Sequence, residues 1–243
     1  MTRNRRTAAL AAGVLALVFA LTGCVAGSPS AGPTAATSPA TSSASPTPAP
    51  TAEPVAPLET VGGLVARPEG LELRALGGDV VATFDYMSAP SDAVAALTTV
   101  FGAPPVDQSY AGTAHSPAGV MHRWDLFVLD ERNYDEVRRQ AEGYDWVVWP
   151  RFAVYFDGPA ADGVILSSVS GVQAGDPWSF AESAPGFDAA VPTCTGTSIE
   201  AVTTTVPSDW TGGNRVNVIA MPSDDGSTVK WIGAPEMEAD GCA

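Results

Sequence analysis

Positively charged residues are scarce in this sequence: 12 lysines and arginines stand against 27 aspartates and glutamates, and the formal net charge is −15. Lys230 is the only lysine, and three of the arginines lie within the first six residues. A chain this acidic repels the phosphate backbone of nucleic acids and anionic lipid head groups. We therefore expect no nucleic-acid partner, and we interpret the acidity as favouring solubility.

Long apolar runs are also missing, apart from one short stretch at residues 8–20. An ordinary transmembrane helix needs about 20 consecutive apolar residues, so this stretch is too short. Arg3, Arg5 and Arg6 precede it. A basic segment followed by a short apolar segment is typical of a signal peptide. We therefore expect the rest of the chain to fold outside the cytoplasm.

The apolar stretch ends in Leu21-Thr22-Gly23-Cys24, which resembles the bacterial lipobox. The resemblance implies that residues 1–23 are removed as a signal peptide and that Cys24 receives a diacylglyceryl group. Two acyl chains anchor a protein stably, whereas a single chain does not. The expected location is the outer face of the cytoplasmic membrane, facing the cell wall. An ordinary secretory signal with a chance cysteine is the alternative, and the general secretory and twin-arginine export routes both stay open.

Cysteine is scarce as well, and only Cys194 and Cys242 remain once Cys24 is assigned to the lipid. An even pair in an oxidising compartment favours a disulfide. Closing a loop of about fifty residues would stabilise the fold by about 3–4 kcal/mol. A metal site is the alternative, but two distant cysteines without a C-x-x-C motif make a poor one. We predict a Cys194–Cys242 disulfide and neither a metal nor a cofactor.

Residues 24–57 differ in composition from the rest of the chain. They are rich in serine, threonine, alanine and proline, and Glu53 is their only charged residue. Such a segment cannot bury a core and favours extended polyproline II conformations. We predict a disordered tether here, open to O-glycosylation, and a folded extracytoplasmic domain at residues 58–243.

The pattern of residues 58–243 predicts an α+β fold with antiparallel sheets and two or three short helices. Helices are expected at residues 91–101, in a short segment after the capping-box pair Asn133 and Glu136, and at residues 176–183. Strands are expected at residues 61–67, 71–76, 80–86, 120–129, 146–156, 163–169, 198–206, 215–221 and 228–233.

Two stretches share an order of elements. Residues 70–104 show a strand, a turn, a second strand and a helix, and residues 163–186 show a shorter version with a strand, a glycine turn and a helix. Antiparallel-looking strands follow each of them. This order suggests a divergent duplication of a small α+β unit. Possible subdomains would then be residues 58–143 and 144–243.

Two short motifs carry a family resemblance. Residues 171–176 (GVQAGD) form a glycine-valine-x-x-glycine-aspartate turn, and residues 231–235 (WIGAP) precede a final cysteine. Both motifs resemble actinobacterial lipoproteins of unknown function. The resemblance implies no activity.

Histidine is nearly absent, and His115 and His122 are the only candidates for a general base of this type. His115-Ser116 is a near miss to the G-x-S-x-G hydrolase motif, because Ala114 replaces the first glycine and no apolar strand precedes it. His122 lies in the predicted strand at residues 120–129, where a packed or solvated side chain is the ordinary outcome. We predict no catalytic residue from either histidine.

Two further motifs fail on their context. Residues 227–230 (STVK) match S-x-x-K, which resembles the nucleophile motif of serine penicillin-binding enzymes, but they begin a strand near the end of the chain. Asp224-Asp225-Gly226 and Asp157-Gly158 lack the alternating carboxylates of a calcium loop. We interpret both as hairpin turns.

Tryptophan is the more suggestive residue type, with six in the chain. Exposed aromatic side chains form stacking platforms and protein-binding hot spots. Trp178 and Trp210 adjoin Pro177 and Asp209 in turn-like surroundings, and we predict a possible binding surface there. The alternative is that all six tryptophans belong to the core or scaffold.

Three functions remain open. The favoured hypothesis is a non-catalytic binding or interaction module at the cell envelope, with another envelope protein or cell-wall glycan as partner. The alternatives are an architectural envelope protein and an unrecognised cell-wall hydrolase. A cleft that brings His115 or His122 near an acidic residue such as Asp125 would favour the hydrolase.

Overall fold

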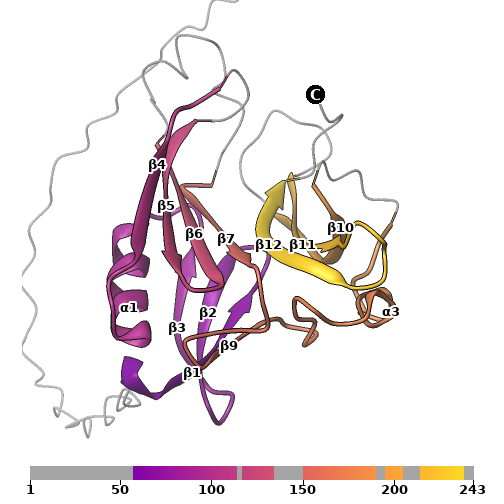
Figure 1. The fold of residues 1–243 in the computed structure, drawn as a ribbon, viewed down its shortest axis with the longest axis horizontal. Helices are drawn as coiled ribbons and strands as arrows, with labels where there is room; N and C mark the ends of the chain where they lie inside the picture. The colour runs from indigo at the N-terminus through magenta and orange to yellow at the C-terminus, as the bar shows by residue number, and fades with distance from the viewer. Residues whose placement is uncertain (1–56, 114–116, 134–149, 190–194, 205–213, 238–243) are drawn as a thin grey trace, which may run out of the picture. The chain divides into compact units, whose positions relative to one another are not determined.

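The computed structural model describes residues 57–113, 117–133, 150–189, 195–204 and 214–237, all within one compact unit, Ala52–Ala243 (Figure 1). No helix in these ranges is long and apolar enough to cross a membrane. The signal segment, Cys24 and the tether up to residue 56 lie outside the described residues, as do Cys194 and Cys242. Lipidation and the disulfide therefore stay predictions.

The first sheet is mixed and has five strands in the order β3-β2-β1-β9-β8. β1 and β9 run parallel, and the other neighbours are antiparallel. Gly78 (φ 92°) forms the turn between β2 and β3 in a conformation that glycine adopts easily. The bounds of the strands are β1 (Val61–Ala66), β2 (Gly70–Ala75), β3 (Val80–Asp85), β8 (Ala160–Ala161) and β9 (Val164–Ser168).

The second sheet is antiparallel throughout and has seven strands in the order β10-β11-β12-β7-β6-β5-β4. β7 lies between two three-stranded meanders, each formed by consecutive strands. The bounds are β4 (Val106–Tyr110), β5 (Ala118–Trp124), β6 (Phe127–Asn133), β7 (Phe152–Phe156), β10 (Thr197–Thr204), β11 (Asn214–Pro222) and β12 (Val229–Met237).

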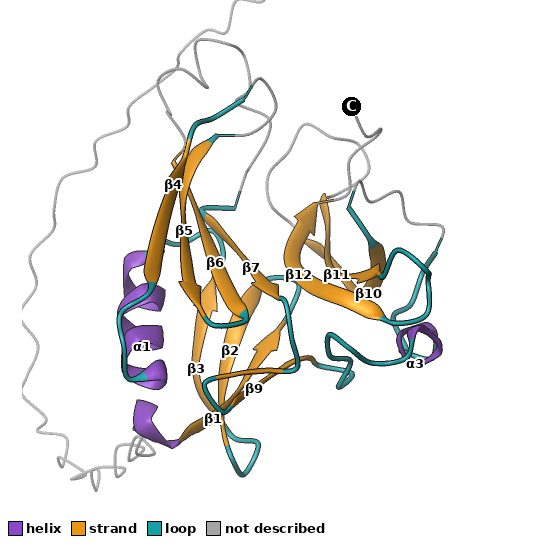
Figure 2. Ribbon diagram, viewed as in Figure 1, coloured by secondary structure: helices purple, strands orange, loops and turns teal. Residues whose placement is uncertain are grey.

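Helices are few in the described part of the chain (Figure 2). They are the 3₁₀ turn η1 (Leu58–Thr60), α1 (Ser91–Phe101) and α3 (Trp178–Glu182). α1 buries Ala93, Ala96 and Leu97, which share one face at helical spacing. Gly102 ends α1 in the left-handed conformation (φ 68°), as glycine commonly does at the end of a helix.

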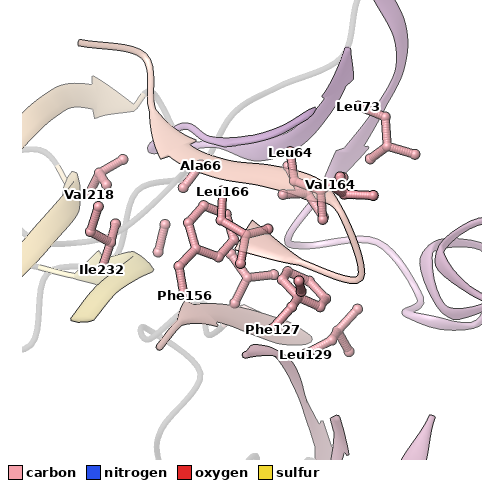
Figure 3. Close-up of a cluster of buried hydrophobic side chains, with 14 of the residues drawn as sticks. Leu64, Ala66, Leu73, Phe127, Leu129, Phe156, Val164, Leu166, Val218 and Ile232 are labelled. Atoms are coloured by element: carbon pink, nitrogen blue, oxygen red, sulfur yellow. The ribbon is translucent and has the colours of Figure 1, made fainter. Parts of the chain in front are cut away.

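The core lies between the two sheets (Figure 3). Leu64 and Leu166 of the five-stranded sheet face Phe127 and Phe156 of the seven-stranded sheet, and all four are 0% exposed. Fully burying one such side chain stabilises the fold by about 1.5–3 kcal/mol. The packing of the two sheets therefore supplies the main apolar contribution to stability.

The predicted α+β class fits only in part, because the described fold is β-rich. The expected antiparallel sheets are present, with β1 and β9 as a parallel exception. The helices expected at residues 91–101 and 176–183 are confirmed as α1 and the shorter α3. The helix expected after Asn133 lies outside the described residues.

The strand predicted at residues 120–129 is wrong. The chain turns back between Trp124 and Phe127, which pair across β5 and β6. Asp125 takes a positive φ of 47° in this two-residue turn, a conformation that aspartate tolerates better than most residues. Apolar alternation continues through the turn, which hid it from the sequence pattern. β4 (Val106–Tyr110) was not predicted.

The possible division into subdomains 58–143 and 144–243 does not match the order of the strands. Both sheets combine strands from both halves of the chain, and one apolar cluster spans them. The order hairpin, helix and three-stranded meander nevertheless occurs twice, as β2-β3-α1-β4-β5-β6 and as β8-β9-α3-β10-β11-β12. The second run begins at β8, before the predicted residues 163–186. The duplication itself stays a prediction.

Candidate functional site

Three consecutive charged residues in β6, Asp130, Glu131 and Arg132, organise the polar chemistry of the seven-stranded sheet. Successive strand residues point to opposite faces of a sheet. Glu131 shares its face with Leu129 and the core, while Asp130 and Arg132 point to the other face. One short segment therefore builds two different polar clusters.

On the core side, His122 lies between two carboxylates. Its Nδ1 is 2.7 Å from Asp107 Oδ1, and its Nε2 is 3.0 Å from Glu131 Oε2. The register explains the contact, because Asp107 in β4 lies directly opposite His122 in β5. A neutral imidazole has one N–H group and the imidazolium has two, so only the imidazolium donates to both carboxylates.

His122 is buried, with its side chain 10% exposed, whereas the side chains of Glu131 and Asp107 are 31% and 58% exposed. The histidine is thus the inner member of the cluster and the two carboxylates are its outer members. The two carboxylates lie on opposite edges of the ring and do not converge on one point. No group of three potential metal ligands is placed to hold an ion among the residues that the structure describes.

On the opposite face, buried Asp130 accepts hydrogen bonds from two side chains. The Tyr110 hydroxyl donates to Oδ1 at 2.6 Å, and Arg132 Nε donates to Oδ2 at 3.2 Å. Arg132 Nη2 also donates to the Tyr155 hydroxyl at 3.4 Å. Burial raises the pKa of Tyr110, and the Asp130 carboxylate raises it further. Burial likewise raises the pKa of Tyr155, so both phenols stay protonated and serve as hydrogen-bonding groups.

A pocket of about 510 Å³ adjoins the His122 cluster, because Glu131 belongs to both. This volume is within the range of small-molecule sites. Residues before α1 form an apolar wall, and the end of β6 and the start of the β7 segment form a charged wall. The lining residues are Met87, Ala89, Pro90, Glu131, Arg132, Asn133 and Arg151.

Backbone hydrogen bonds connect the segments around this pocket. The Tyr86 carbonyl accepts from the N–H groups of Arg151 at 2.7 Å and Phe152 at 3.4 Å. The Arg151 carbonyl accepts from the Arg132 N–H at 2.8 Å. The buried rings of Tyr86 and Phe152 pack edge to face beneath these bonds, with centroids 5.2 Å apart. The backbone that carries the two walls is therefore held in a defined geometry.

The sequence-predicted candidates lie elsewhere or outside the described residues. Trp178 is half-buried at the start of α3 and packs edge to face on Phe187, 6.1 Å between centroids. Trp210 and His115 lie outside the described residues. His122 is near acidic residues, as the hydrolase hypothesis required, but these are Asp107 and Glu131 rather than Asp125.

The turn before β12 is the hairpin turn expected from its sequence. Ser223 and Ser227 hydroxyls donate to Asp225 Oδ1 at 2.6 and 2.8 Å. These bonds, with the Ser227 N–H, lower the pKa of Asp225 to about 2. The S-x-x-K match leads into β12 and therefore has no helical setting. Its Lys230 is exposed and pairs with Asp224 at 2.9 Å.

Sequence reasoning missed Asp107, Glu131 and Arg151 as site residues. β4 contains no apolar alternation that would have identified it as the partner of β5. Comparison with protein-family models, curated proteins and solved structures found no match for this chain.

Proposed function

We propose that this chain is a membrane-anchored lipoprotein whose folded part is a non-catalytic binding module at the cell envelope. The lipobox-like sequence at residues 21–24 and the tether at residues 24–57 support the anchoring. The tether would hold the folded part away from the membrane surface, where it could meet another envelope protein or cell-wall material.

The pocket beside the His122 cluster is the observation that carries the binding function. Its walls combine apolar contact at Met87 and Pro90 with charged groups at Glu131 and Arg151. Binding sites for small ligands commonly pair apolar walls with a few well-placed polar groups. No hydroxyl, thiol or amine side chain is among its described lining residues, which favours binding over nucleophilic catalysis.

Anchoring is tested by Cys24→Ala in the expressing bacterium. The variant is expected in the medium or as an unprocessed precursor, because it lacks the acceptor for the lipid. Immunoblotting of membrane and medium fractions measures this. A variant that stays in the membrane at mature size would contradict the anchoring.

Binding is tested with the isotope-labelled mature chain, residues 24–243, carrying Cys24→Ser to prevent lipidation. A library of small polar compounds and soluble cell-wall fragments is screened by amide chemical shifts. We expect saturable shifts at Ala89, Glu131 and Asn133, which surround the pocket. Shifts confined to other surfaces would contradict this site.

A second candidate function is hydrolysis with Glu131 as general base. The observation in its favour is that His122 orients a pocket carboxylate, because its Nε2 holds Glu131 Oε2 at 3.0 Å. Release of soluble fragments from purified cell wall, abolished by Glu131→Gln, would establish this function instead. An architectural role predicts neither pocket binding nor release of fragments.

A further inference from the structure

Opposite charges line one pocket in a chain that is otherwise strongly acidic. Glu131 and Arg151 both face the 510 Å³ space, beside the apolar side chains of Met87, Ala89 and Pro90. We propose that the pocket binds a small zwitterionic ligand, an amino acid or a dipeptide with both ends free, with Glu131 facing its ammonium group and Arg151 its carboxylate. This inference rests on the proposed binding function and specifies its ligand class.

Glu131 is prepared to bind a cation. Its Oε2 is occupied by His122 Nε2 at 3.0 Å, which orients the carboxylate. Its Oε1 accepts no hydrogen bond from the described residues, and the side chain is 31% exposed. A charged hydrogen bond to an ionised group is stronger than a neutral one. A ligand ammonium is therefore the donor that suits Glu131 best.

Arg151 supplies the positive side. Its backbone is held by hydrogen bonds to Tyr86 and Arg132, and its side chain is exposed at the pocket. Arg132 is less suited, since its guanidinium is directed to Asp130 and Tyr155, on the opposite face of the sheet from Glu131. A guanidinium has five N–H donors, so Arg151 can bind a ligand carboxylate in bidentate fashion and keep another partner.

The apolar wall of the pocket and the net charge of the chain restrict the class of ligand further. Met87, Ala89 and Pro90 offer apolar contact to a small side chain such as a methyl group. A ligand with negative charge alone would approach against the strongly acidic net charge of the chain. A ligand with positive charge alone would offer no carboxylate to the Arg151 guanidinium. A zwitterion carries a partner for Glu131 and a partner for Arg151 on the charged wall, and its small side chain can contact the apolar wall.

The test uses the mature chain with Cys24→Ser and three probes: alanyl-alanine, its N-acetyl derivative and its C-terminal amide. Binding is followed by amide shifts at the pocket residues. We expect alanyl-alanine to bind and each blocked derivative to bind at least about tenfold more weakly, because each lacks one charge.

Variants assign the charges. Glu131→Gln should abolish the preference for alanyl-alanine over its N-acetyl derivative. Arg151→Gln should abolish the preference for alanyl-alanine over its C-terminal amide. Arg123→Gln is the matched control, because Arg123 pairs with Asp157 at 2.9 Å outside the pocket and should leave all three affinities unchanged.

Two results would overturn the ligand class: no shift at about 50 mM alanyl-alanine, well above a millimolar Kd, or equal affinity for the blocked derivatives. If cell-wall fragments still shift the pocket residues while alanyl-alanine does not, the binding module stands and only the zwitterionic ligand is wrong. If no compound shifts these residues, both proposals fail.

Discussion

The Arg67 guanidinium joins the two sheets, since its Nη2 lies 3.0 Å from Glu200 Oε1. Arg67 follows β1 of the five-stranded sheet, and Glu200 belongs to β10 of the seven-stranded sheet. The two side chains are 34% and 15% exposed, so the pair is partly shielded from water. This contact connects the sheets outside their apolar core.

The first prediction concerns Glu200 and pH. Burial raises the pKa of Glu200 above its usual value, and Arg67 lowers it by less. Folding therefore favours the protonated carboxyl, and this stabilising contribution is present below the ordinary glutamate pKa and lost as pH rises through the raised pKa. Glu200→Gln should remove this loss. Urea unfolding between about pH 4 and pH 8 should show a smaller decline in unfolding free energy for the variant than for the parent.

Glu59→Gln, at an exposed position, is the control for this measurement and should follow the parent curve. Parallel curves for the parent and Glu200→Gln would show that Glu200 makes no such contribution.

The second prediction concerns Gly119, over which the Tyr110 ring lies. A Cβ at this position would collide with the Glu131 carbonyl oxygen and the Tyr110 ring, and the backbone oxygen cannot move aside easily. We expect Gly119→Ala to lower the unfolding free energy by about 1–3 kcal/mol. Gly77→Ala is the matched control, because a Cβ there meets nothing within 4 Å. Equal stability of the two variants in urea unfolding would refute the close packing.

The third prediction concerns the hydrogen bond between Tyr110 and buried Asp130. Tyr110→Phe removes a donor 2.6 Å from Asp130 Oδ1, and should cost about 1–2 kcal/mol of unfolding free energy. Tyr155→Phe removes only an acceptor for a longer bond of 3.4 Å and should cost less. Thermal and urea unfolding measure both. A larger loss of unfolding free energy for Tyr155→Phe than for Tyr110→Phe would contradict this prediction.

The fourth prediction is the Cys194–Cys242 disulfide. Labelling of free thiols in the unfolded, unreduced chain carrying Cys24→Ser should find none. Reduction should then lower the unfolding free energy by about 3 kcal/mol, because the unfolded chain gains conformational entropy. Two labelled thiols per molecule would exclude the bond.

Local sequence signals predicted local structure well. The apolar spacing of Val94, Leu97, Val100 and Phe101 and the terminal Gly102 were sufficient to predict α1. Glycine turns identified the hairpins at Gly78 and Gly226. The β5–β6 hairpin was missed, since its turn at Asp125 contains neither glycine nor proline and the apolar alternation runs across it.

The candidate site could not be predicted from local sequence signals. His122, Asp107 and Glu131 are separated by 15 and 9 residues along the chain, and only the register of three strands brings them together. Arg151 reaches the same region through backbone bonds to Tyr86 and Arg132. None of these pairings has a local motif.

The sequence by itself determined the features that depend on neighbouring residues: the acidic charge, the signal-like N-terminus, the composition of the tether, the helices α1 and α3 and the hairpin turns at Gly78 and Gly226. Only the tertiary structure decided which strands share a sheet, how both halves of the chain build one core, and which charges meet at the pocket. The physical reason is that strand pairing and sheet packing join residues far apart in the chain, and their register selects which polar side chains are buried together.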